Sequence, residues 1–258
     1  MLFETILFER REHIAHVTLN RPDRLNALDA TLTRELTAAA GLISADASIR
    51  AVLLKSAGRA FCSGADLMRS GADSVESSLR DQLNPMVRAW YHLSLPVVVA
   101  VHGIAAGAGV SLALAGDIVI AARSAVFLQL FAPKLGLMPD LGGSFHLPRM
   151  VGSARAKGLA LLGDPLTASD AAAWGLIWAC VDDAALLEES ENIARRLAHG
   201  PTRAYRQIKE VFNEEPPRTI EEQLERELRA QTALGDTRDF AEGLSAFRAK
   251  RAPQFRGE

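Results

Sequence analysis

The chain has 258 residues, of which 48% are hydrophobic, so it can bury a sizeable core as one large domain or as one domain with a small appendage. Its 29 Lys and Arg residues nearly balance its 31 Asp and Glu residues, which argues against nucleic acid or an anionic membrane as a partner. The two cysteines lie far apart, no basic leader precedes an apolar segment, and no apolar run approaches about 20 residues. We therefore expect a reduced, cytoplasmic protein without a signal peptide or a membrane span.

The first part of the chain alternates predicted strands with predicted helices. Residues His13–Asn20 alternate in polarity as a strand does and end in the turn sequence NRPD. From Asp29 onward, apolar residues recur three or four apart, as in a helix. The segments IRAVLLKS, LPVVVAVHG and GDIVIAA predict further strands, and the second is apolar enough to be buried on both faces. This alternation indicates an α/β fold with parallel strand pairing.

The pattern changes near residue 184, after which only helices are predicted. A capping box, T-x-x-E, opens the segment TIEEQLERELRAQTAL. An apolar stripe with spacing i, i+4, i+7 follows from Phe240, and it must dock on the protein's own core or on a neighbouring subunit. We predict a core region of residues 1–195 and a C-terminal helical region of residues 196–258.

A first glycine-bearing loop, GRAFCSGADL, covers Gly58–Leu67 and follows the strand that ends near Lys55. Gly64 permits a sharp turn because it has no Cβ. Such a turn can leave the N–H of the next residue, Ala65, pointing outward. In isolation, an ordinary strand-to-helix loop explains this segment better than a binding site does.

A second glycine-bearing loop, HGIAAGAGVSLALAGD, follows the most apolar predicted strand. Gly107 and Gly109 allow a ligand to approach the N-terminus of the next helix, where free N–H groups and the positive end of the helix dipole favour negative charge. A dinucleotide-binding turn is a poor match, because Leu112 occupies the third glycine position and Asp117 comes too early for the ribose acid. Together, the two loops could supply two amide donors to an oxyanion.

Asp140 lies between a proline and two glycines in the segment LGLMPDLGGS. One interpretation is a helix N-cap, since this acid precedes a glycine-rich helix start. The other is an active-site base, whose pKa apolar neighbours such as Leu137 and Met138 would raise by desolvation.

Five segments taken together, LNRPDRLNAL, AFCSGADL, HGIAAGAGVSLALAGD, LGLMPDLGGS and FRAKRAPQF, resemble the crotonase superfamily of enoyl-CoA hydratases and isomerases over nearly the whole chain. The resemblance implies an α/β crotonase-like spiral of ββα units with a C-terminal helical trimerisation region. It further implies a homotrimer or hexamer, an acyl-CoA thioester as substrate, and no metal or cofactor apart from the coenzyme A of the substrate.

The resemblance also implies roles for individual residues. The amides of Ala65 and Ala108 would stabilise a thioester enolate. The two glutamates of hydratases are replaced by Ser111 and Ala132, whereas Asp140 stands where isomerase branches carry an acid. We therefore expect an acyl-CoA isomerase, similar to the branches that act on a ring epoxide of phenylacetyl-CoA or on linear 3-enoyl-CoA.

Further substrate contacts are implied by position in the family. Coenzyme A carries phosphates that favour basic partners, although surface solvation explains Arg24 and Lys250 equally well. Cys62 has no basic partner that would activate its thiol, so it fits a core or pocket wall better than a nucleophile. The implied substrate and coenzyme A contacts are Arg24, Leu25, Cys62, Gly64, Asp66, Leu67, Gly107, Ala132 and Lys250.

Three alternatives stay open. An enoyl-CoA hydratase shares the scaffold, but water addition needs groups that Ser111 and Ala132 do not provide. Thioester hydrolase and dehalogenase branches are weaker matches. A non-catalytic protein that binds coenzyme A or RNA on the same scaffold would not need an acid at Asp140.

Overall fold

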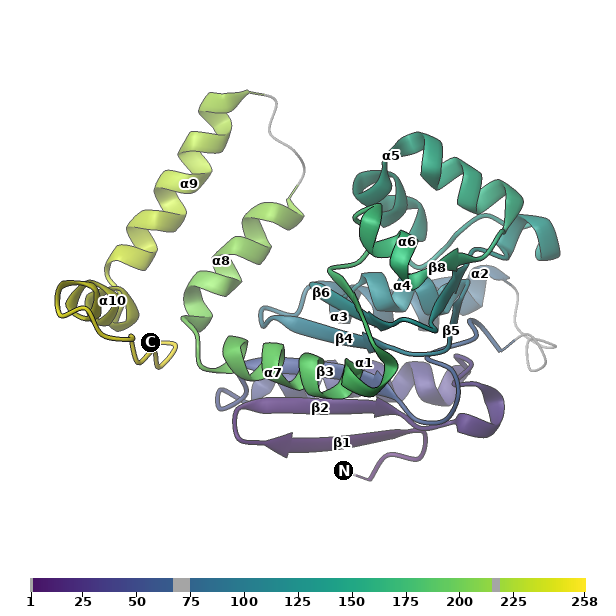
Figure 1. The fold of residues 1–258 in the computed structure, drawn as a ribbon, viewed down its shortest axis with the longest axis horizontal. Helices are drawn as coiled ribbons and strands as arrows, with labels where there is room; N and C mark the ends of the chain where they lie inside the picture. The colour runs from purple at the N-terminus through teal and green to yellow at the C-terminus, as the bar shows by residue number, and fades with distance from the viewer. Residues whose placement is uncertain (1, 67–74, 215–218) are drawn as a thin grey trace.

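The computed structural model describes residues 2–66, 75–214 and 219–258. A six-stranded sheet has the order β1-β2-β3-β4-β6-β9, and a three-stranded sheet has the order β5-β7-β8 (Figure 1). The larger sheet consists of β1 (Ile6–Arg11), β2 (Ile14–Leu19), β3 (Ala51–Ser56), β4 (Val97–Val101), β6 (Ile118–Ala122) and β9 (Ala179–Val181). The smaller sheet consists of β5 (Ile104–Ala106), β7 (Val126–Leu128) and β8 (Leu166–Thr167).

Parallel pairing dominates the larger sheet, as the alternation of strands and helices predicted. Only the β1–β2 hairpin is antiparallel, and the other neighbouring pairs are parallel. Every residue of β4 is buried, because this β-branched strand lies inside the sheet and is covered on both faces. The predicted α/β class is confirmed.

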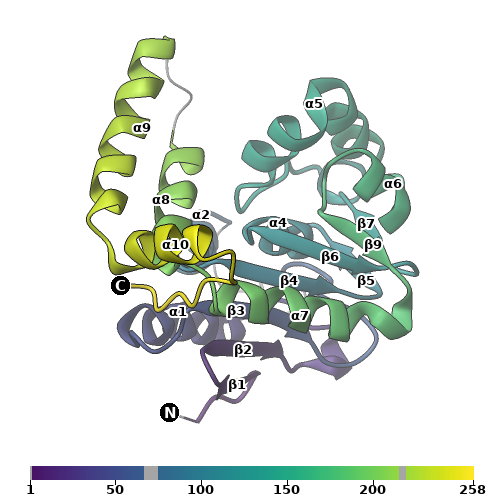
Figure 2. The same cartoon turned by 60° about the vertical axis from the view of Figure 1, so that its left-hand side comes forward.

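Helices cover the larger sheet and connect its parallel strands (Figures 1 and 2). The helical segments are η1 (Pro22–Arg24), α1 (Ala30–Ala45), α2 (Val75–Ser77), η2 (Ser78–Leu83), α3 (Asn84–Tyr91), α4 (Ala108–Leu114), η3 (Phe131–Leu135), α5 (Gly143–Leu162), α6 (Ala168–Ala173), η4 (Asp183–Ala185), α7 (Leu186–Ala198), α8 (Thr202–Asn213), α9 (Ile220–Gly235) and α10 (Arg238–Arg248). None of the helices in the described ranges has the length and apolarity needed to cross a membrane.

Helix α1 begins where the sequence predicted it. The side chain of Asp29 accepts a hydrogen bond from the backbone N–H of Leu32 at 2.9 Å and so caps the first turn. The apolar face of α1 packs on α3, where the indole N–H of Trp90 donates to the carbonyl of Leu36 at 3.0 Å. On the sheet itself, α7 packs against β3 and β4. The predicted division after residue 195 lies within α7 and stays a prediction.

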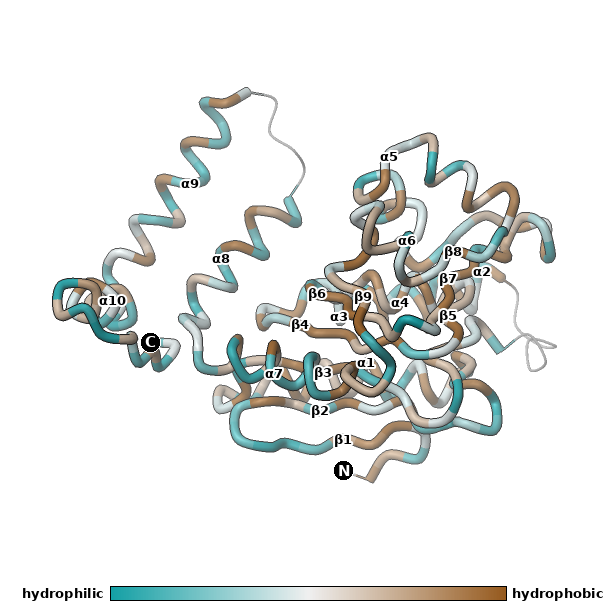
Figure 3. Tube along the Cα trace, viewed as in Figure 1, coloured by the Kyte–Doolittle hydropathy of each residue, from teal (hydrophilic) through white to brown (hydrophobic). Residues whose placement is uncertain are grey.

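Three helices, α8, α9 and α10, form an arm that projects beside the core (Figures 1 and 2). The predicted capping box opens α9, since the Thr219 hydroxyl accepts the N–H of Glu222 at 3.2 Å. Apolar residues recur along the arm (Figure 3). The predicted stripe on α10 is not covered by the chain's own core, because Phe247 is 82% exposed. Of the two predicted partners for this stripe, the neighbouring subunit stays a prediction.

Lys209 fastens α8 to the edge of the core. Its Nζ lies 2.6 Å from Oδ2 of Asp117 and 2.8 Å from the carbonyl oxygen of Leu95. The same carboxylate oxygen accepts the N–H of Val97, the first residue of β4, at 2.7 Å. One charged pair therefore joins the arm to the central strand.

We expect Lys209→Met to lower the free energy of unfolding by about 3 kcal/mol, because it leaves the largely buried carboxylate of Asp117 without its cation. Urea unfolding of the full chain measures the change. Lys157→Met, which alters an exposed lysine on α5, serves as the control and should stay within about 0.5 kcal/mol of wild type. Equal stability of the two variants would contradict this role of Lys209.

Candidate active site

The two glycine-bearing loops lie against each other. The N–H of Cys62 donates to the carbonyl of Ile104 at 3.1 Å, and the N–H of Ala106 returns a bond to the carbonyl of Cys62 at 2.9 Å. A Cβ built on Gly64 would lie 2.9 Å from the carbonyl oxygen of Ala106 and 3.5 Å from the amide nitrogen of Ala108. The backbone of the first loop therefore runs directly beside the start of α4.

Two of these glycines are required by geometry. Gly64 has φ of +100°, in the region that favours glycine, and a side chain there would press on the second loop. Gly109 lies in the first turn of α4, and a Cβ at this position would overlap the carbonyl group of Cys62. The close approach of loop and helix depends on the absence of both side chains.

The N–H of Ala65 points away from Leu28, the residue with which Ala65 pairs. Leu28 bonds to the residues on either side of Ala65: its N–H donates to the carbonyl of Gly64 at 2.8 Å, and its carbonyl accepts the N–H of Asp66 at 3.0 Å. In such an extended pairing the intervening N–H faces the opposite side. Within the described residues, no acceptor lies within hydrogen-bond distance of the Ala65 N–H.

The amide of Ala108 is the first of α4. The N–H of Gly107, which precedes it, donates to the carbonyl of Leu128 at 2.8 Å, and the N–H groups of Val110 and Ser111, later in the helix, donate to the carbonyl of Gly107. The N–H of Ala108 has no such acceptor in the part of the chain that the structure describes, as expected for the first turn of a helix. The predicted pair of donors is therefore brought to one place by the fold.

Asp140 does not cap α5, so the N-cap interpretation is wrong. Helix α5 begins at Gly143, its N-cap is Gly142 with φ of +83°, and no side chain caps it. The main-chain carbonyl of Asp140 instead accepts the hydroxyl of Ser111 and the N–H of Gly143, both at 2.8 Å. The bond from Ser111 holds the backbone of Asp140 against α4, three residues after Ala108, and the bond from Gly143 closes the turn into α5.

The carboxyl group of Asp140 is partly buried, and one of its two oxygens has no hydrogen-bond partner in the described chain. Its Oδ1 contacts no donor among the residues described, and desolvation by burial raises the pKa of the group to about 6. The predicted source of this burial is wrong, since Leu137 and Met138 are largely exposed. A carboxyl with a pKa in this range can both accept and release a proton near neutral pH.

The two positions at which the resemblance implies glutamates in hydratases hold no acid in this chain. Ser111 is fully buried, and its hydroxyl is used in the bond to Asp140. Ala132 lies in η3 and is partly buried. Of Ser111, Ala132 and Asp140, only Asp140 therefore provides a carboxylate beside α4.

Cys62 lies in the buried core beneath the first loop, and nothing around it activates its thiol. It is completely buried, and burial raises the pKa of its thiol to about 12, so the thiol stays protonated at neutral pH. Gly107 has φ of +51°, and a Cβ there would lie 3.5 Å from the ring of Phe131.

The remaining predicted contacts are more scattered. Leu25 has φ of +49°, and its carbonyl accepts the N–H of Ser63 at 3.0 Å, which joins it to the first loop. Arg24 is exposed in η1. Lys250 follows α10 on the projecting arm, so one chain does not bring it to Ala65 and Ala108 (Figure 1). Leu67 lies outside the described residues. The roles of these residues stay predictions.

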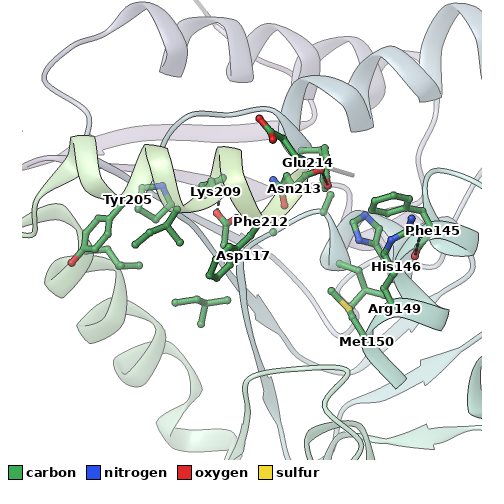
Figure 4. Close-up of a pocket in the computed structure, with 18 residues that line it drawn as sticks. Asp117, Phe145, His146, Arg149, Met150, Tyr205, Lys209, Phe212, Asn213 and Glu214 are labelled. Carbon is green, nitrogen blue, oxygen red and sulfur yellow. Dashed lines mark hydrogen bonds and ion pairs between the residues drawn. The ribbon is translucent and has the colours of Figure 1, made fainter. Parts of the chain in front are cut away.

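A cavity of about 540 Å³ between α5 and α8 contains none of the three candidate catalytic residues (Figure 4). Its lining includes Tyr91, Phe145 and His146, whose rings pack together. Burial lowers the pKa of His146 to about 4, so this histidine is neutral at physiological pH. A smaller cavity of about 350 Å³ borders Ala65 and Asp66. Across the described ranges, no group of three His, Cys, Asp or Glu side chains could hold a metal, and the expected absence of a cofactor stays untested.

Arg21 is a residue near the site that the sequence placed only in a turn. Its guanidinium group lies between the carboxylates of Asp29 and Asp66. No spacing rule pairs an arginine with an acid 45 residues away, so the sequence carried no signal for this contact.

The chain is similar to known proteins over its whole length. The family model described as Enoyl-CoA hydratase/isomerase matches residues 9–258. The chain is 46% identical to a probable enoyl-CoA hydratase of Rhodobacter capsulatus and 44% identical to the 1,2-epoxyphenylacetyl-CoA isomerase of Escherichia coli K12, in both cases over 100% of each chain. The structure of an enoyl-CoA hydratase from Bacillus anthracis superposes with a TM-score of 0.92 at 33% identity, covering 99% of this chain and 100% of that one. These neighbours confirm the expected crotonase-like fold.

We expect Gly109→Ala to lower the free energy of unfolding by about 2 kcal/mol, because the added methyl group overlaps the Cys62 carbonyl and must push α4 from the first loop. Chemical denaturation measures the loss. Gly158→Ala in α5 is the control: its methyl group would meet no atom within 4 Å, so it should be neutral or slightly stabilising. A tolerated Gly109→Ala would show that the two loops do not need this close contact.

We expect Asp140→Asn to be more stable than wild type at pH 8, by on the order of 2 kcal/mol. The folded pKa of about 6 lies above the ordinary value of 3.8, so ionisation of Asp140 opposes folding. The wild type therefore loses stability relative to the variant as the pH rises from about 4 to about 6, and the difference should shrink again toward pH 4. Unfolding curves across this range test the sign, with the exposed Asp164→Asn as control. A variant that is less stable at pH 8 would contradict the burial of a lone carboxylate.

Proposed function

The chain belongs to the enoyl-CoA hydratase/isomerase family, and on this basis we propose that it is an acyl-CoA isomerase in which Asp140 moves a proton on a thioester held by the amides of Ala65 and Ala108. The observation that carries the proposal is a carboxyl with one buried, unpartnered oxygen, Oδ1 of Asp140, fixed beside the helix whose first N–H has no acceptor in the described chain. The substrate is an acyl-CoA, whose coenzyme A is the only cofactor-like group required.

The proposed reaction uses two features in turn. The thioester oxygen accepts hydrogen bonds from the amides of Ala65 and Ala108, which stabilise the negative charge that develops there. The carboxylate of Asp140 removes a proton from a carbon near the thioester, and the electron pair delocalises into an enolate. Asp140 then returns the proton to a different carbon, so the double bond moves and no atom is gained or lost. A pKa near 6 suits both transfers.

We propose two substrates in order; the ring epoxide requires a bond of its three-membered ring to break in addition to the proton transfer, whereas the linear substrate does not. The name of the Escherichia coli relative supports 1,2-epoxyphenylacetyl-CoA as the first. A linear 3-enoyl-CoA is the second, because it needs only the proton transfer just described. The arm supports the further proposal of a homotrimer or hexamer, since its apolar side chains are exposed on a single chain.

Hydratase activity is the rival function, and the name of the Rhodobacter capsulatus relative favours it. Adding water across a double bond requires a group that activates water as well as one that delivers a proton. Ser111 is occupied by its bond to the Asp140 carbonyl, and Ala132 has no polar group. A single carboxylate suffices for isomerisation, which is why we prefer that reaction.

We expect Asp140→Asn to lower the rate of conversion of a 3-enoyl-CoA to its 2-enoyl isomer by about 10² to 10⁴-fold, because the amide cannot accept the proton. Wild-type turnover should also fall as the pH drops below about 6, where Asp140 becomes protonated. Absorbance of the conjugated product follows the reaction, and Asp164→Asn should match wild type.

Hydration of crotonyl-CoA is measured in parallel with the same preparations. Rapid hydration by wild type would favour the hydratase function. Isomerisation that persists in Asp140→Asn would show that another group carries the proton, and tight binding of acyl-CoA with no turnover by wild type would favour a binding protein.

A further inference from the structure

Arg21 joins two carboxylates that belong to different parts of the site. Its Nη2 lies 2.9 Å from Oδ2 of Asp29 and 3.3 Å from Oδ2 of Asp66, and its Nη1 donates to the carbonyl of Ala27. The three charged side chains are only 12%, 6% and 10% exposed, in the order arginine, Asp29, Asp66. Ion pairs this well shielded from solvent are stronger and less screened by salt than surface pairs.

Each carboxylate anchors a neighbouring backbone segment. Asp29 caps α1 through the N–H of Leu32 and is therefore fixed to a long helix that packs on the core. Asp66 directly follows Ala65, and its own N–H donates to the carbonyl of Leu28 at 3.0 Å. Arg21 therefore ties the peptide unit beside the first oxyanion donor to the rigid start of α1.

Two backbone hydrogen bonds with Leu28 hold this side of the loop. Among the described residues, a cavity of about 350 Å³ also borders the loop here, next to Leu28, Ala65 and Asp66. On its other side the loop contacts the start of α4. Gly64 and Gly109 lie at this contact, and neither has a side chain that could pack there. The buried charged contact of Arg21 adds a side-chain tie between Asp66 of the loop and Asp29, the residue that follows Leu28.

We propose that Arg21 is a positioning residue that sets the direction of the Ala65 N–H toward the thioester oxygen. The inference rests on the proposed function, since it assumes that this amide binds an acyl-CoA carbonyl. Arginine is suited to the task because its planar fork reaches two carboxylates and a carbonyl at once, which the single ammonium of lysine cannot do in the same geometry. Removing this bond network should weaken carbonyl polarisation more than substrate binding.

The test uses a chromophoric ligand and does not require turnover. A cinnamoyl-type CoA thioester with an electron-donating para substituent absorbs at longer wavelength when its carbonyl oxygen accepts hydrogen bonds. We expect wild type and Asp140→Asn to produce this red shift on binding. Arg21→Lys and Arg21→Met should reduce the shift by roughly half or more, because a displaced amide polarises the carbonyl less.

Kinetics give a second readout. With a 3-enoyl-CoA, the Arg21 variants should show kcat lowered by about 10 to 100-fold and KM changed by less than about threefold, since the donor acts mainly in the transition state. The pH at which activity falls should stay unchanged, because Asp140 is held by other contacts. Arg123→Met removes an exposed arginine paired with Asp182 at 2.8 Å and is the matched control, expected to equal wild type in both assays.

The outcomes separate the two proposals. A normal red shift in a folded Arg21→Lys variant would overturn the positioning role. If Arg21→Met fails to unfold cooperatively, Arg21→Lys and Asp66→Asn decide the question, and Asp66→Asn should reproduce the loss because it breaks the contact nearest Ala65. A wild-type red shift without isomerase activity would overturn the proposed reaction. The spectra of the Arg21 variants would then still support or refute the positioning role of Arg21. Absence of a red shift in wild type would overturn the inference itself.

Discussion

The close approach of two backbone segments is the constraint on which the site depends. The loop that contains Cys62 and Gly64 runs beside β5 and the first turn of α4, at a distance that leaves no room for a Cβ at Gly64 or Gly109. This contact brings the amides of Ala65 and Ala108 together. Asp140 depends on the same helix, because Ser111 of α4 holds its carbonyl. The two amides and the acid are therefore all positioned by one short helix, α4.

Much of this arrangement could be predicted from local sequence. The apolar run around β4 indicated a strand buried on both faces, and glycines after two predicted strands indicated where backbone amides are accessible. Both features follow from the properties of neighbouring residues along the chain. The choice between an N-cap and a buried base at Asp140 could not be made in this way, because it depends on where α5 begins and on a partner in α4.

Long-range charge pairing was the other feature beyond prediction. Arg21 and Asp66 are separated by 45 residues, and Lys209 and Asp117 by 92, so no periodicity connects them. The burial of Asp140 was expected from the wrong neighbours, since an apolar residue next to an acid in sequence need not lie against it in space. In both cases the chemistry was visible in the residue types, but the partners were set by the tertiary fold.

The two proposed donors are main-chain groups, and this affects which residues the site requires in the sequence. No substitution at Ala65 or Ala108 deletes an amide unless it introduces proline, so the identity of these residues is weakly constrained by the chemistry. The information lies in their neighbours, above all in glycines that do not touch the substrate's reacting atoms. Sequence variation among related proteins is therefore a poor guide to where the thioester oxygen binds. The positions that tolerate the least change are the glycines that make room for the two amides, and not the residues that carry those amides.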